Sequence, residues 1–293
     1  MSRKLFEDAY RKFWDRIESG DGTYLHCLDY GVCSEVDAAT WAIPMVELMV
    51  EGELRETINQ LNSWRRYLND LDIWNLVLAE YGEEDSLQIA HHFVLQLVHF
   101  CMHQPAAIRD LLIRVATNGI HQANLICRDG YLDRLDQDVL VRKGKEGFLS
   151  RRAAENQLRR VGGGWESGAT LLDALAKLDN RQYRNATLDY RNRASHFIAP
   201  RLLAGQVELY LRFLTPAQSR VDNEDGSFSF VEVPNKKVVA YGLGGIDPFS
   251  LDDIIKLNKP QYLCAVEALS VYETLLRETI KLKGGGSNNR KAK

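Results

Sequence analysis

The sequence predicts an all-α protein, a helical bundle with one small inserted β-hairpin near residues 228–241. Apolar residues recur every three or four positions through most of the chain, which is the spacing of one buried stripe on a helix. Near the C-terminal part the period changes to two on either side of Pro234-Asn235-Lys236-Lys237, which indicates two strands and a turn. With 293 residues, 45% of them hydrophobic, the chain can bury a substantial core.

Helical spacing and helix-end signals place the individual helices. The first helix, with its stripe from Leu5 to Ile17, ends at Gly20-Asp21-Gly22, and Ser34 with Asp37 predicts a capped helix over 38–49. Pro105 fits the first turn of a helix. Residues 1–282 are predicted to form one large helical domain and residues 283–293 a disordered tail. The remaining helices are expected at about 53–69, 71–81, 86–103, 106–127, 148–160, 168–179 and from Ser250 onward.

Composition and charge limit the classes of function. The formal net charge is −3, so the chain as a whole is not a general binder of polyanions. Seven basic and two acidic residues lie between Arg142 and Arg160; this is either a solvated helix face or a local phosphate-binding surface that includes Arg151 and Arg152. The first twenty residues are charged throughout, and no apolar run reaches the roughly 18 residues that span a bilayer. We expect a cytoplasmic protein with no membrane partner.

One segment points to chemistry, the hexapeptide Arg191-Asn192-Arg193-Ala194-Ser195-His196. An arginine fork can clamp a phosphate, and a histidine can transfer a proton near neutral pH. RNA carries its own nucleophile, the 2′-hydroxyl, so its cleavage needs only these two functions and no metal. On a continuous helix Arg191 and His196 would be about 140° apart. A joint site therefore requires a distorted segment, with Pro200 placing His196 near a helix end, or a second copy of the chain.

The hexapeptide resembles the R-x4-6-H signature of the HEPN-domain proteins, and Asn192 matches the polar residue that often follows the arginine. The resemblance implies a helical bundle of HEPN-like type that dimerises and joins two motifs into a metal-independent endoribonuclease for single-stranded RNA. Arg191 would stabilise phosphate charge, His196 would transfer a proton, and Asn192 would orient the motif. No cofactor is expected; the expected partners are RNA, a second copy and a regulatory protein. The candidate phosphate contacts are Arg193, Arg184, Arg151 and Arg152.

Two other functions fit the same sequence. The chain could be a non-catalytic interaction or scaffold module of a bacterial defence or stress system, in which the motif only holds a dimer together. It could also bind a metal through His92, His99 and His103, which fall at i, i+7 and i+11, although their apolar setting favours ordinary, partly buried histidines. Without any function, Arg191 would pair with Asp189 or Glu166 and His196 would cap a helix.

A second match to the pattern, Arg114 with His121, is weaker. Val115 follows the arginine where the pattern favours a polar residue, and Asn118-Gly119 interrupts the interval. We therefore expect the chemistry at the hexapeptide.

Overall fold

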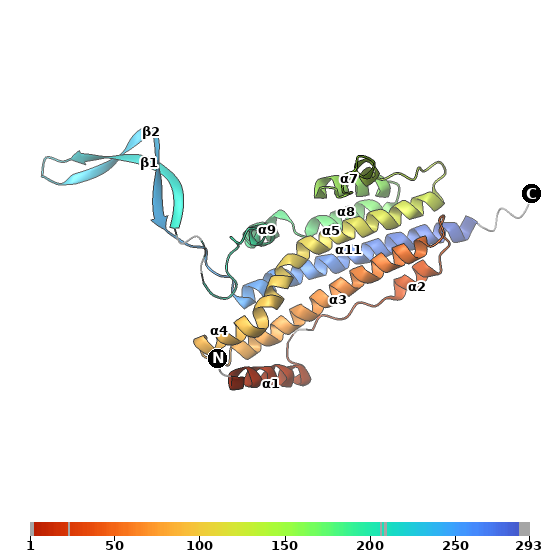
Figure 1. Ribbon diagram of the computed structural model, residues 1–293, viewed down its shortest axis with the longest axis horizontal. Helices are drawn as coiled ribbons and strands as arrows, with labels where there is room; N and C mark the ends of the chain where they lie inside the picture. The colour runs from red at the N-terminus through yellow and green to blue at the C-terminus, as the bar shows by residue number, and fades with distance from the viewer. Residues whose placement is uncertain (1–2, 23, 206, 208–209, 287–293) are drawn as a thin grey trace, which may run out of the picture.

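The protein is mostly helical and carries one antiparallel two-stranded hairpin (Figure 1). The computed structural model describes residues 3–22, 24–205, 207 and 210–286. The elements in chain order are α1 (Arg3–Ser19), α2 (Gly31–Asp37), α3 (Val46–Leu78), α4 (Glu83–Ile89), the π-helical turn η1 (Ala90–Val94), α5 (Leu95–Cys127), α6 (Asp136–Arg142), α7 (Arg151–Gly162), α8 (Glu166–Lys177), α9 (Arg181–Ala186), α10 (Tyr190–Ala194), β1 (Tyr210–Asp222), β2 (Phe228–Leu243) and α11 (Leu251–Gly286).

Three long helices, α3, α5 and α11, run side by side and hold the core between them (Figure 1). Their facing stripes bury large apolar side chains completely, with Trp64 of α3 packed edge-on against Tyr262 of α11. Helices α7 and α8 pack on α5, α8 also packs on α11, and α1 packs on α3. The predicted helical class is therefore confirmed, and burial of these stripes supplies the main stabilising free energy.

The helix boundaries differ from the predicted ones where packing outweighs local signals. The helix predicted over 38–49 forms only from residue 46, as the start of α3: α2 ends at Asp37, and Met45 takes a left-handed φ of 69° before α3 begins. Pro44 explains the break directly before α3, because a proline disfavours helical geometry in the residue before it, here Ile43. Pro105 was wrongly placed at a helix start, since it lies inside α5, where the helix is buried on both sides of it. Helix packing there compensates for the hydrogen bond that proline cannot donate.

The hairpin is longer than predicted, and its predicted turn was wrong. Residues 223–227 make the turn, with Gly226 at φ 82°, and β1 pairs with residues 228–232 and 237–243 of β2. The segment Pro234–Lys237 lies inside β2, where Asn235 has a φ of 58° and the register shifts opposite Pro216 and Gln218. A bulge, in which one strand has extra residues, uses the same turn-forming residues as a hairpin loop. Figure 1 shows the hairpin projecting away from the helical bundle.

The last helix also runs further than predicted. The tail was expected to begin at residue 283, but α11 continues to Gly286, and the rest of that predicted tail, 287–293, lies outside the described residues. Among the described helices, none combines the length and the apolarity that crossing a bilayer requires.

Candidate functional site

The hexapeptide forms a short helix followed by a tight turn. Helix α10 ends at Ala194, and the amide of His196 donates to the carbonyl of Arg193 at 3.1 Å, so His196 lies just beyond the helix end. The backbone is left-handed at both ends of this segment, with φ of 52° at Asp189 and 59° at Phe197. The motif is thus a distorted segment, one of the two arrangements that would allow Arg191 and His196 to act together.

Arg191 and His196 are both accessible to solvent. The Arg191 side chain is 52% exposed, and its Nη2 atom lies 3.7 Å from Oδ2 of Asp110 on α5. Neither Asp189 nor Glu166 is its ion-pair partner within the part of the chain that the structure describes. His196 is exposed, and the two side chains do not hydrogen-bond to each other among the described residues. A site using both therefore needs the substrate, or a second copy, to bridge them.

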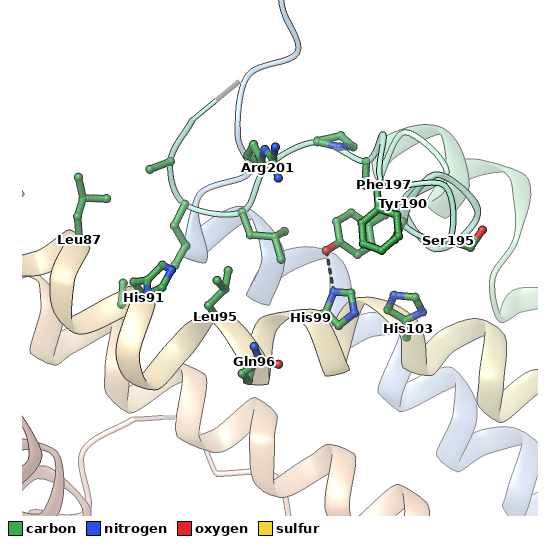
Figure 2. Close-up of a pocket in the computed structure, with 17 residues that line it drawn as sticks. Leu87, His91, Leu95, Gln96, His99, His103, Tyr190, Ser195, Phe197 and Arg201 are labelled. Carbon is green, nitrogen blue, oxygen red and sulfur yellow. Dashed lines mark hydrogen bonds between the residues drawn. The ribbon is translucent and has the colours of Figure 1, made fainter. Parts of the chain in front are cut away.

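Tyr190, directly before Arg191, anchors the motif to α5. Its ring is buried, and its hydroxyl lies 3.0 Å from Nδ1 of His99, a hydrogen bond drawn in Figure 2. Burial raises the pKa of Tyr190 to about 12, so the hydroxyl keeps its proton at neutral pH. This anchor was not predicted, although the tyrosine adjoins the motif, because its partner is 91 positions away in the sequence.

His103 lies beside this anchor and close enough to Arg191 for the charge of the arginine to affect its pKa. Its ring centroid is 4.6 Å from that of His99 and 5.8 Å from that of Tyr190. Burial lowers the pKa of His103, and the neighbouring His99 and Arg191 lower it further. Its Nε2 atom is buried and has no hydrogen-bond partner among the described residues. A neutral imidazole with an unused nitrogen therefore lies next to the motif.

The π-helical turn η1 decides which histidines join this cluster. A π-turn inserts one residue into the helix, so His91 and His99 are separated by the equivalent of seven α-helical residues, about 20° from alignment. His92 and His99 are separated by the equivalent of six α-helical residues, so His92 is rotated by about 120° from His99 around the helix axis. Its ring instead stacks on Phe6 of α1, with ring centroids 4.4 Å apart. His92, His99 and His103 thus do not share a face. Among the described residues no group of three metal-ligating side chains could hold an ion.

A cavity of about 790 Å3 opens between the motif segment and α4–η1–α5. Figure 2 shows His91, Leu95, His99 and His103 along the helical side, with Tyr190, Phe197 and Arg201 on the segment opposite. Neither Arg191 nor His196 lines it, but Tyr190, Ala194 and Ser195 do. The cavity therefore adjoins the candidate catalytic residues without containing them.

The other predicted site residues are dispersed. Arg151 donates to Asp110 at 2.6 Å and to Asp179; burial disfavours its charge, but these two carboxylates outweigh burial and raise its pKa. Arg152 and Arg184 are exposed on α7 and α9, and Arg193 donates from Nε to the carbonyl of Ile198 at 3.0 Å. Arg151 is thus a structural ion-pair residue, whereas Arg152 and Arg184 remain accessible.

Asn192 and the second motif match complete the set of predicted residues. Asn192 is exposed, and its carbonyl accepts a hydrogen bond from Oγ of Ser195 at 2.7 Å. His121 is buried. Its Nδ1 atom lies 2.8 Å from the Tyr131 hydroxyl, and its Nε2 atom lies 2.8 Å from Oδ1 of Asp133. Because both of its nitrogens are engaged, His121 is not available to a substrate. Comparison of the chain with protein-family models, curated proteins and solved structures gives no match.

Proposed function

We propose that the protein is a metal-independent endoribonuclease of HEPN-like type that cleaves single-stranded RNA and acts as a homodimer. The observation that carries the proposal is the exposure of both Arg191 and His196 on a distorted segment that Tyr190 fixes to α5. Asp110 is only a weak competitor for Arg191, because both of its oxygens already accept hydrogen bonds from Arg151, at 2.6 and 3.0 Å. The Arg191 fork is therefore available to a phosphate.

The chemistry follows from these two side chains and the RNA. The 2′-oxygen of the ribose attacks the adjacent phosphorus, and the bond from phosphorus to the 5′-oxygen breaks. His196 transfers a proton, either from the attacking hydroxyl or to the leaving oxygen, while Arg191 stabilises the negative charge on the non-bridging oxygens. The products are a 2′,3′-cyclic phosphate and a 5′-hydroxyl. In this proposal the backbone carbonyl of Asn192 supports the turn, since it accepts a hydrogen bond from the Ser195 hydroxyl.

Cleavage of labelled single-stranded RNA in excess EDTA tests the proposal. Arg191→Ala and His196→Ala should each lower the rate by about 100-fold or more, because each removes a group that acts in the transition state. Arg181→Ala and His26→Ala, which remove an exposed arginine and an exposed histidine elsewhere, are matched controls and should cut like the wild type. Undiminished cleavage by the His196→Ala protein would contradict the assignment.

Mixing the two inactive variants tests the composite dimer site. If each site takes Arg191 from one copy and His196 from the other, a mixed dimer has one intact site. Random exchange should then restore about a quarter of the wild-type rate, because half of the dimers are mixed and one of the two sites in each mixed dimer is intact. No recovery after verified subunit exchange would show that both residues act within one copy.

A second candidate function, a non-catalytic interaction module, is favoured by the hairpin. Large apolar side chains are exposed along both of its strands, among them Phe213, Leu214, Phe230 and Tyr241. Exposed apolar surface of this extent commonly marks a protein–protein contact. This function predicts that the pure protein never cuts RNA and that changes at Arg191 and His196 weaken association instead.

A further inference from the structure

The chemistry of the cavity beside the motif favours an uncharged or anionic ligand over a cation. Its described lining contains three histidines and Arg201 but no aspartate or glutamate. The remaining polar groups come from Gln96, Tyr190 and Ser195, and the other lining residues are apolar. A volume of about 790 Å3 falls within the roughly 300–1,000 Å3 of pockets that take small organic ligands. The cavity can therefore hold a group of the size of one nucleotide.

Flat rings gather at one end of the cavity. The rings of His99 and His103 both approach Tyr190, with centroids 6.0 and 5.8 Å away and planes tilted by 70° and 78°. Phe197 stands at the mouth with 93% of its surface exposed, held there by a left-handed backbone (Figure 2). Aromatic side chains that face solvent at a cavity mouth are the usual stacking surfaces for unpaired bases.

One polar atom in this cluster is left without a partner. The buried Nε2 atom of His103 makes no hydrogen bond among the described residues, an arrangement that is unfavourable for a polar atom removed from water. Gln96 lines the same cavity and offers both a donor and an acceptor. A base edge, which presents donors and acceptors side by side, could bond Gln96 directly, and could bond His103 once a rotation of its ring brings the buried Nε2 atom into the cavity.

The position of the cavity relative to Arg191 links it to RNA. Tyr190 and His103 line the cavity, and the charge of Arg191, the candidate phosphate clamp, acts on His103, so Arg191 lies near enough to bind a phosphate of a nucleotide held in the cavity. Arg201 lies across the cavity on the loop that follows the motif, where a second phosphate of the same strand would pass (Figure 2). We propose that this cavity is a specificity subsite that receives one base of the RNA, next to the phosphate to be cleaved.

This inference rests on the proposed function, and it specifies which part of the RNA the chain recognises. A base buried between His103 and Gln96 would be selected by its edge, so cleavage should favour particular bases next to the cut. By contrast, a site made only of Arg191 and His196 would contact phosphate and ribose and would carry no base preference.

Binding of a labelled RNA hexanucleotide to the His196→Ala protein tests the subsite without cleavage. In that background Leu95→Trp should fill the cavity, His103→Leu should remove the unpartnered nitrogen, and Arg201→Ala should remove the second phosphate contact. Each change should weaken binding by about 10-fold, which corresponds to roughly 1.4 kcal/mol. Arg181→Ala in the same background is the control and should bind like the parent. Thermal unfolding verifies that every variant is folded.

Mononucleotides distinguish a subsite for RNA from a site for a free ligand. The proposal predicts that AMP, CMP, GMP and UMP bind far more weakly than the hexanucleotide, because the single phosphate of a mononucleotide cannot reach both Arg191 and Arg201. A mononucleotide that binds as tightly as the hexanucleotide, and that Leu95→Trp excludes, would overturn the assignment to RNA. Equal binding of the hexanucleotide by all four proteins would overturn the subsite itself.

Cleavage by proteins that retain His196 separates this proposal from the proposed function. Leu95→Trp should still cut RNA but at different positions from the wild type. If the wild type cuts and Leu95→Trp cuts at identical positions, the function holds and the subsite fails. If the wild type never cuts but hexanucleotide binding depends on Leu95 and His103, the subsite holds and the catalytic proposal fails.

Discussion

Arg151 and Arg152 are neighbours in the sequence, yet the fold gives them different environments. Arg151 contacts Asp110 and Asp179, and the Asp179 side chain is only 7% exposed. Arg152 is exposed on the outer face of α7. Both were predicted as phosphate contacts from the same basic cluster. The pattern of charges along a chain cannot separate them, because the carboxylates that engage Arg151 come from other parts of the chain.

Replacing the two arginines should therefore have unequal effects on stability. Arg151→Met keeps much of the side-chain volume but leaves Asp179 as an unpaired buried charge, and should lower the free energy of unfolding by about 3 kcal/mol. Arg152→Met should change it by less than about 0.5 kcal/mol. Urea denaturation at constant m-value measures both. Equal stability of the two variants would mean that the pairs of Arg151 contribute nothing.

At the scale of elements, α5 and α11 make a close contact at Gly119. A Cβ atom there would lie 2.1 Å from the hydroxyl oxygen of Tyr272, which donates to the carbonyl of Val115 at 3.2 Å. Tyr272 is completely buried, so its ring has no free space into which to move. Close contact between these two helices thus depends on the absence of a side chain at this position.

Two glycine-to-alanine changes should act in opposite directions. Gly119→Ala should destabilise the protein by about 1–3 kcal/mol, because overpacking outweighs the better helix propensity of alanine. At Gly52 in α3 an added Cβ atom meets no atom within 4 Å, so Gly52→Ala should stabilise the protein by about 0.5–1 kcal/mol. Thermal and urea unfolding measure both effects. Adding Tyr272→Phe to Gly119→Ala should recover part of the loss, and purely additive effects would contradict the clash.

The π-turn shows why the candidate site was only partly predictable from the sequence. Helical spacing correctly indicated that residues 86–103 are helical, but a single inserted residue leaves no clear mark on a hydrophobic period. It changes which histidine lies on the same helical face as His99, so His91 lines the cavity in place of His92. A local distortion at the motif was one of the two arrangements that the sequence indicated, because Pro200 and the spacing of Arg191 and His196 both act over a few residues.

For the whole molecule, the sequence predicted those features that depend on periodicity. The helical class and the start of α11 follow from stripes of apolar residues, and the strand pattern located part of the hairpin. The pairing of β2 with β1 could not be obtained in the same way, because a bulge and a turn use similar residues. Contacts such as that of Tyr190 with His99 join distant segments, and a single sequence carries no direct signal for them.

Removing the hairpin should leave the bundle folded. Nearly all of its side chains are exposed, and Val207 and Ile246 already pair at its base, with the Ile246 amide donating at 3.1 Å. Replacing residues 210–243 with a short Gly-Ser linker should therefore leave the urea midpoint of the helical bundle nearly unchanged. A large fall in the midpoint, followed by far-ultraviolet circular dichroism, would show that the hairpin stabilises the bundle.

The projecting hairpin also affects how the proposed dimer can be detected in solution. A compact chain of 293 residues has a radius of gyration of about 19 Å, but an arm that extends beyond the bundle increases this value without adding mass. On a sizing column a single elongated copy would elute early and imitate a compact pair. The molar mass from light scattering is independent of shape, so it must be measured in every subunit-mixing experiment on this protein.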